Sequence, residues 1–139
     1  MIDKDVYNWK SLNPLFKKGE AIPVSRRASK DAFKEAHKRL LDEKIVSLYP
    51  EGGISKNGDI GKFHKGYEMI PKDYDGVIIP FFIDGIFGSK FSKHKPNTKK
   101  RFYKRREIKV YFGEPLSKEI ESESLRDVVV DMKEKYEIK

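Results

Sequence analysis

The chain has 139 residues, of which 37% are apolar and 12% aromatic, and it has no cysteine. That length supports one compact domain with one buried core. Without cysteine there is no disulfide framework and no thiolate metal site, so we expect a reducing, cytoplasmic setting. The longest apolar run, residues 77–83, is far below the roughly 20 residues that span a bilayer. We therefore expect no membrane-crossing segment, and the first ten residues match neither a signal peptide nor a transit peptide.

The net charge of +8 predicts an anionic partner or surface. Residues 88–109 carry ten Lys or Arg against the single acid Glu107, and Phe91, Phe102 and Tyr103 are interleaved with them. Because cations neutralise phosphates and aromatic rings favour an interface, this segment is predicted to bind an anionic membrane surface or nucleic acid. A solvated basic loop is an equally good interpretation.

Hydrophobic spacing predicts three elements in the first part of the chain. Residues 4–16 suit a helix with apolar positions at intervals of three and four, although Pro14 leaves its end uncertain. Residues 21–25 suit a short strand. Residues 30–43 suit an amphipathic helix that Ser29 caps. The predicted apolar positions of these two helices are Val6, Trp9, Leu12, Phe16, Ala32, Phe33, Ala36, Leu40 and Leu41.

The second part of the chain is predicted to hold three more strands. Residues 44–49 form a β-branched run, which indicates a buried strand leading into a glycine-rich loop, and a brief helix is expected before Pro71. Residues 76–83 are apolar at successive positions, which is typical of a strand covered on both faces, while Pro80 indicates an edge or a bulge. Residues 106–113 alternate, so we expect a strand with Lys109 and Tyr111 on its exposed side.

A final helix is predicted from Ser122 or Ser124 onward, with its apolar side formed by Leu125, Val128, Val129, Met132 and Tyr136. Connections that contain helices favour parallel neighbouring strands. The predicted fold class is therefore α/β, with a mixed, mostly parallel sheet flanked by helices, in a single domain over residues 1–139.

The glycine-rich loop follows a predicted strand, which is where α/β folds place ligands. It does not match the nucleotide-binding P-loop G-x-x-x-x-G-K-[ST], because Gly58 is followed by Asp59 and Gly61-Lys62 by Phe63. No pair of its glycines brackets a single residue, so the dinucleotide fingerprint G-x-G-x-x-G is also missing. Neither ATP nor NAD is indicated.

The order YPEGGIS-x-x-G-x-x-x-x-F-x-x-G over residues 49–66 resembles the third conserved block of the glycerophospholipid acyltransferases, the lysophosphatidate acyltransferase superfamily. LFKKGEAIPVSRR at 15–27 is similar to the second block and GVIIPFFIDG at 76–85 to the fourth. Residues 82–92 and 110–117 resemble the acyltransferase segment of large bacterial proteins that also contain a transporter-like part and an acyl-carrier-protein synthetase. The resemblance covers the chain from about residue 12.

The resemblance implies transfer of a fatty acyl group from acyl-CoA or acyl-carrier protein to a hydroxyl of a lysophospholipid or glycerophosphate, on the cytoplasmic face of a membrane. It implies that a cation of the second block binds the acceptor phosphate, and that the Glu-Gly of the third block shapes and polarises the same pocket. Guanidinium groups bind phosphate bidentately, and glycines let backbone amides approach an anion. The substrate-binding residues implied in this way are Arg26, Arg27, Pro50, Glu51, Gly52, Gly53, Ser55, Gly58 and Pro80.

The first block of the family, H-x-x-x-x-D, supplies the general base, and residues 1–18 contain no histidine. His37 and Asp42 match its spacing, but they lie within a predicted helix, where residues five apart point about 140° away from each other. We therefore expect His37 to be an exposed helical residue and assign no catalytic residue. The fold expected is an acyltransferase-like fold lacking its N-terminal part.

No group of histidines and carboxylates has metal-ligand spacing, so neither a metal nor a cofactor is implied. The alternative function is a non-enzymatic basic module that binds an anionic membrane surface or nucleic acid through residues 88–109. The ordered blocks favour the acyltransferase, because a charge-driven binder has no need of them, and on that interpretation no nucleic acid partner is expected. The acceptor headgroup, the acyl length and the oligomeric state stay open.

Overall fold

The computed structural model describes residues 1–25, 29–55, 57–88 and 107–137. The chain divides into two compact units. The N-terminal unit comprises Met1–Pro50 and Lys65–Asp75, and the C-terminal unit comprises Glu51–His64 and Gly76–Lys139. The glycine loop, defined here as residues 51–61, therefore belongs to the C-terminal unit.

The N-terminal unit begins with a short parallel strand pair and two short helices. Strand β1 (Ile2–Asp3) pairs with β2 (Pro23–Val24). Helix α1 (Lys4–Tyr7) is capped by the Asp3 carboxylate, which accepts the amide of Asp5 at 2.9 Å, and α2 spans Asn13–Lys18. The single helix predicted over residues 4–16 is thus two helices. Pro14 explains the break, because proline fits the first turn of a new helix but not a helix interior.

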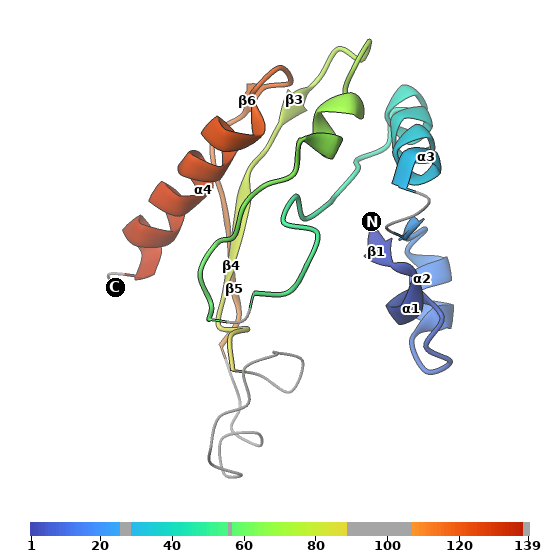
Figure 1. Ribbon diagram of the computed structural model, residues 1–139, viewed down its shortest axis with the longest axis horizontal. Coiled ribbons are helices and arrows are strands. Elements are labelled where there is room, and N and C mark those ends of the chain that lie inside the picture. The colour runs from blue at the N-terminus through green and yellow to red at the C-terminus, as the bar shows by residue number, and fades with distance from the viewer. Residues whose placement is uncertain (26–28, 56, 89–106, 138–139) are drawn as a thin grey trace. The chain divides into compact units, whose positions relative to one another are not determined.

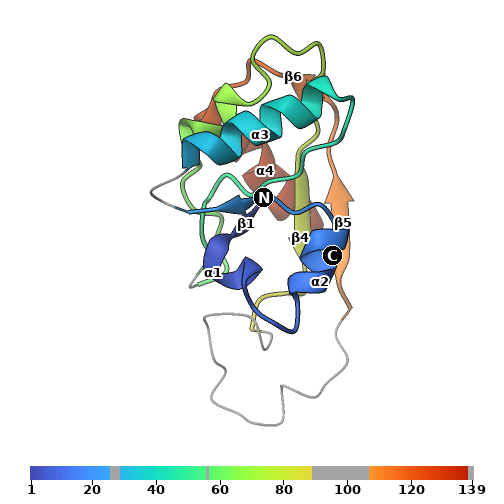
Figure 2. The ribbon, with the colours of Figure 1, turned by 90° about the vertical axis from the view of Figure 1, so that its right-hand side faces the viewer.

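Helix α3 (Ser29–Leu41) confirms the amphipathic helix predicted over residues 30–43. Ala32 and Ala36 are buried on it, and the 3-10 helix η1 (Lys65–Met69) packs against α3 with Tyr67 buried. Gly66 allows this contact, since a Cβ there would lie 2.7 Å from the Phe33 ring. Strand β2 contacts α3, and its partner β1 is labelled in Figure 2.

The strand predicted over residues 44–49 is wrong, because the structure has no regular element there. Ile45 is 98% exposed, and within the described residues no strand pairs with this segment. Glu43 has φ +58° and the amide of Lys44 returns to the carbonyl of Arg39 at 2.9 Å, so the chain turns sharply at the end of α3. A β-branched segment forms a strand only where another strand pairs with it, and the composition of the segment does not show whether such a partner exists.

The C-terminal unit contains two antiparallel strand pairs and one long helix. Strand β3 (Val77–Ile78) pairs with β6 (Leu116–Ser117), and β4 (Phe81–Asp84) pairs with β5 (Lys109–Phe112). Helix α4 (Ser122–Glu137) packs along one face of the β4–β5 pair (Figure 1). The helix predicted from Ser122 is confirmed, and Leu125, Val129 and Met132 are buried on its inner side.

The expectation of a mostly parallel sheet is wrong, although the mixed α/β class is confirmed. Among the described residues the only parallel pair is β1–β2, while β3–β6 and β4–β5 are antiparallel. The prediction treated the helices as crossover connections between neighbouring strands. The strands of the C-terminal unit instead pair with partners in the same unit, and α4 follows the last of them in the chain.

The faces of the β4–β5 pair also differ from the prediction. The Tyr111 ring stacks on Tyr136 of α4 with centroids 4.1 Å apart, whereas Val110 and Phe112 are 47% and 69% exposed. Alternation along β5 is therefore correct, but the side that packs on α4 is the one predicted to be exposed. Residues 76–83 do not form one strand covered on both faces, because the chain breaks at the buried Pro80 and Ile79 is 51% exposed.

Candidate functional site

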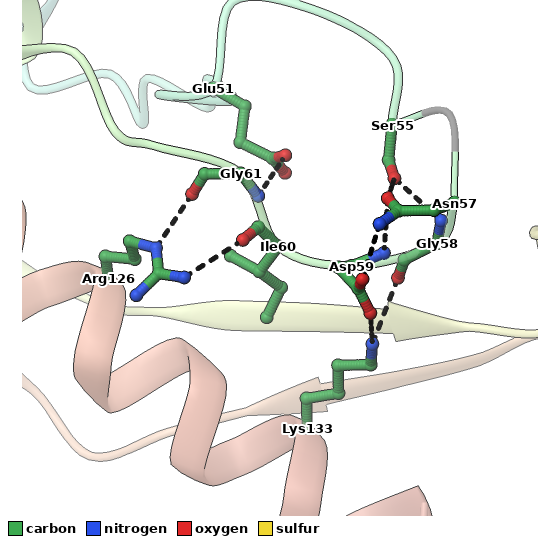
Figure 3. Close-up of polar contacts among 9 residues, drawn as sticks. All are labelled: Glu51, Ser55, Asn57, Gly58, Asp59, Ile60, Gly61, Arg126 and Lys133. Carbon is green, nitrogen blue, oxygen red and sulfur yellow. Dashed lines mark hydrogen bonds and ion pairs between the residues drawn. The ribbon is translucent and has the colours of Figure 1, made fainter.

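The glycine loop is closed by its own acid. One carboxylate oxygen of Glu51 accepts a hydrogen bond from the amide of Gly61 at 2.8 Å, across ten residues (Figure 3). A Cβ at Gly61 would lie 2.9 Å from that oxygen, so only glycine allows the carboxylate to approach the backbone this closely. Glu51 thus joins the two ends of the loop, and its half-buried side chain is fixed by a charge-assisted bond.

A side-chain turn shapes the middle of the loop. The Ser55 hydroxyl accepts the amide of Gly58 at 2.8 Å and donates to the Asn57 side-chain oxygen at 3.2 Å. The Asn57 side-chain amide donates to the Asp59 carboxylate at 2.5 Å. Gly58 has φ +89°, a region that residues with a Cβ rarely adopt, and a Cβ there would lie 3.0 Å from the Phe87 ring. Ser55 and Gly58 are therefore brought together as parts of one turn.

Gly52 and Gly53 present an open stretch of backbone at the start of the loop. Gly52 has φ +61°, and a Cβ on it would be 3.3 Å from the His64 ring, whereas a Cβ on Gly53 would meet nothing within 4 Å. Both glycines are exposed, and within the described residues the Gly53 amide donates no backbone hydrogen bond to another residue. An exposed amide of this kind is a suitable donor to an anion.

Two cations of α4 hold the far side of the loop. Arg126 donates from Nε to the carbonyl of Gly61 at 2.9 Å and from Nη2 to the carbonyl of Ile60 at 3.2 Å. Lys133 donates to the carbonyl of Gly58 at 3.0 Å and lies 3.5 Å from the Asp59 carboxylate. Residues seven apart lie on the same side of a helix, about 10 Å apart along its axis, so the pair spans residues 58–61 (Figure 3).

The predicted site residues have different positions in the structure. The structure places Glu51, Gly52, Gly53, Ser55 and Gly58 together in the loop, and Pro50 is the last residue of the N-terminal unit before it. Pro80 is buried in the C-terminal unit, where its ring lies close to Gly113. Arg26 and Arg27 lie outside the described residues, as do most residues of the basic segment 88–109. The assignment of this set to substrate binding stays a prediction.

The histidines differ in their surroundings. His37 is half-buried rather than exposed, because its Nδ1 lies 2.7 Å from the carbonyl of Ile70, between α3 and the end of η1. That contact gives His37 a structural partner in the N-terminal unit. His64 lies against Gly52, and His94 lies outside the described residues.

Sequence reasoning missed Arg126 and Lys133. They contact carbonyls that lie 65 to 75 residues earlier in the chain, so no local pattern indicates the contact. The sequence feature that could have indicated them is that they are seven residues apart on a predicted helix, at positions outside its apolar side. Charged residues at such positions are usually solvated, so the signal alone would not have identified them.

Within the described part of the chain, no cluster of three or more His, Asp or Glu side chains could hold a metal ion. No helix in that part has the length and apolar character needed to cross a membrane.

The comparison with known families identifies the class of protein. The acyltransferase family matches residues 1–84, which is more than half of the chain and includes the whole glycine loop. The chain therefore belongs to the acyltransferase family, and its general function is acyl transfer. No solved structure matches the chain. Helix α4, with Arg126 and Lys133, lies beyond the matched residues.

Proposed function

We propose that the glycine loop is part of the acceptor site of a phospholipid acyltransferase. The reaction transfers a fatty acyl group from acyl-CoA or acyl-carrier protein to a hydroxyl of a lysophospholipid or glycerophosphate. The hydroxyl oxygen attacks the thioester carbonyl carbon, the ester C–O bond forms, the C–S bond breaks, and the hydroxyl proton ends on the departing thiol. In this reaction the glycine loop binds the phosphate group of the acceptor.

The observation that carries the proposal is the exposed glycine backbone at residues 52–53, beside a carboxylate that already accepts a hydrogen bond. One oxygen of Glu51 accepts the hydrogen bond from the Gly61 amide, so Glu51 acts by closing the loop. It does not bind the phosphate, because the two negative charges repel each other. The positive φ of Gly52 and the open space at Gly53 allow the backbone to approach an anion. The family resemblance assigns Arg26 and Arg27 to the acceptor phosphate, and that assignment stays a prediction.

The general base is not assigned to a residue of this chain. The family resemblance gives that role to the His–Asp pair of a first block, and residues 1–18 contain no histidine. His37 is engaged with the Ile70 carbonyl. The proposal therefore concerns acceptor binding by the loop, and its test must measure binding separately from turnover.

The test is the affinity of the chain for glycerophosphate and for lysophosphatidate below its micellar concentration, with monoacylglycerol as the phosphate-free control. We expect both phosphates to bind and monoacylglycerol not to bind. Glu51→Ala should weaken binding by about tenfold or more, because it removes a hydrogen bond to a charged group that shapes the site. Glu114→Ala, which removes an exposed acid in the same unit, should leave the affinity unchanged. Equal binding by wild type and Glu51→Ala would contradict the proposal.

A second arm measures acyl transfer from a labelled long-chain acyl thioester to lysophosphatidate. Transfer that Glu51→Ala abolishes and Glu114→Ala spares supports the full reaction in this chain. Phosphate binding without transfer supports the acceptor site alone. Neither binding nor transfer would contradict both statements.

We also propose that the basic segment 88–109 brings the protein to an anionic membrane surface, which is where a lysophospholipid acceptor resides. The charge of the segment supports this. Sedimentation with vesicles containing phosphatidylserine should exceed that with neutral phosphatidylcholine vesicles and should fall steeply as salt is raised. Equal sedimentation with both kinds of vesicle would contradict the proposal.

A further inference from the structure

One peptide group of the glycine loop lies between a guanidinium and a carboxylate. The carbonyl of Ile60 and the amide of Gly61 belong to the same peptide bond. Arg126 Nη2 donates to that carbonyl at 3.2 Å, and the amide on the other side of the bond donates to Glu51 at 2.8 Å. Figure 3 shows Arg126, the 60–61 peptide and Glu51 in sequence across the loop.

Such an arrangement strengthens the bond to the acid. A cation at the carbonyl oxygen polarises the peptide, makes its N–H a better donor and so favours the bond to the carboxylate. Arg126 also donates from Nε to the next carbonyl, that of Gly61, at 2.9 Å. A planar guanidinium can serve both carbonyls at once with fixed geometry, which a lysine ammonium on a flexible stem cannot do equally well.

We propose that Arg126 of α4 is a positioning residue for Glu51 and acts through the peptide bond between Ile60 and Gly61. Arg126 reaches the loop from a helix that lies outside the family-matched residues. Buried Leu125 and Val129 anchor that helix in the C-terminal unit. The link joins the fixed helix to the carboxylate that closes the loop, and its effect on acceptor binding rests on the proposed function.

Lys133 provides the contrast within the same helix. Lys133 donates to the carbonyl of Gly58 and pairs with the Asp59 carboxylate. Both residues precede the 60–61 peptide that Glu51 contacts. The Lys133 side chain is 17% exposed, so it also stabilises the loop. Because it does not contact the 60–61 peptide, its removal should disturb the turn at residue 58 without acting through Glu51.

The direct readout is the amide proton chemical shift of Gly61, which reports the hydrogen bond to Glu51 whether or not the protein binds a lipid. We expect Glu51→Gln and Arg126→Met each to move this resonance upfield, and Arg126→Lys to restore part of the shift. Lys135→Met removes an exposed cation of α4 that stacks on Tyr136, and it should leave the Gly61 resonance in place. A Gly61 amide that is unchanged by Arg126→Met would overturn the proposal, whatever the binding result.

The second readout is a double-mutant cycle on lysophosphatidate affinity. Arg126→Met should weaken binding by about tenfold, the order expected for a lost hydrogen bond to a charged group. The double variant Arg126→Met/Glu51→Gln should bind lysophosphatidate only slightly more weakly than the weaker-binding single variant. Each substitution interrupts the same series of hydrogen bonds from Arg126 through the 60–61 peptide to Glu51, so their effects should not add. Additive losses from Arg126→Met and Glu51→Gln would overturn the proposal. If wild type binds no acceptor while the Gly61 amide still responds to Arg126→Met, the proposed function fails and the link between Arg126 and Glu51 stands.

Discussion

Two glycines of the loop serve different purposes at the residue scale. Gly58 has φ +89° and faces the Phe87 ring, so its lack of a Cβ serves the fold. Gly53 has open space around it, so its lack of a Cβ is not required by any neighbour in the described structure. The first residue belongs to the architecture of the loop and the second to its accessible surface.

Alanine substitutions should separate these purposes. Gly58→Ala should lower the free energy of unfolding by about 1–3 kcal/mol, because it combines an unfavourable backbone conformation with a contact of 3.0 Å to an aromatic carbon. Gly53→Ala should change it by less than about 0.5 kcal/mol and should instead reduce acceptor affinity. Denaturant unfolding measures the free-energy change of both variants. Equal destabilisation by Gly58→Ala and Gly53→Ala would contradict the different roles given to the two glycines.

Glu20 gives a second prediction at this scale. The hydrogen bond from Lys44 at 2.7 Å, followed by the charge of that lysine, holds the pKa of Glu20 below its ordinary value. Because the folded pKa is the lower one, the stabilising effect of the pair is present above the ordinary Glu pKa and is lost as pH falls through the folded pKa. Lys44→Met should raise the pKa of Glu20 in a carbon-detected NMR titration.

Salt distinguishes this pair from a buried one. Both side chains are at least half exposed, so added salt should move the pKa of Glu20 in wild type toward its ordinary value. The same addition should have little effect in Lys44→Met. A Glu20 pKa that does not respond to Lys44→Met would show that the pair does not form in solution.

At the element scale, the β4–β5 pair is oriented by its contact with α4. The rings of Phe82, Tyr111 and Tyr136 form a stacked series, with centroid separations of 6.4 Å and 4.1 Å. Phe112 points to the opposite face, where it is 69% exposed. Periodicity predicts that alternate residues share a face, but it does not say which face packs on the helix.

Alanine substitutions on β5 test that orientation. Tyr111→Ala should cost about 2–4 kcal/mol of unfolding free energy, because it removes a stacked ring from the contact with α4. Phe112→Ala should cost less than about 1 kcal/mol, since most of that ring is already in water. Urea unfolding followed by circular dichroism measures both, and a larger loss for Phe112→Ala would reverse the assignment of faces.

Prediction from sequence succeeded where a local pattern determined the element. The spacing in α3 and α4 was sufficient, because an amphipathic helix satisfies its own backbone and needs only one apolar side. It failed for residues 44–49, whose strand required a partner elsewhere in the chain. It also missed Arg126, since the order of residues in the loop identifies Glu51 but not the distant helix that fixes it.

At the scale of the whole molecule, family membership and loop geometry support one account. The acyltransferase match covers residues 1–84, and within it the glycine loop is closed by Glu51, with the exposed backbone of Gly52 and Gly53 beside that residue. The described residues of the C-terminal unit add α4, which holds the loop from outside the matched part. Acceptor recognition is therefore expected to depend on residues far apart in the sequence.

The measurement that tests this account most directly is a titration of the chain with glycerophosphate, followed through the amide chemical shifts of every assigned residue. We expect the amides of Gly52 and Gly53 to move most and to saturate together, with smaller changes at Gly61. Glu51→Ala should shift the saturation to a glycerophosphate concentration about tenfold or more higher, while Glu114→Ala should leave it unchanged. Saturating shifts that leave Gly52 and Gly53 unmoved would contradict the assignment of the glycine loop to the acceptor phosphate.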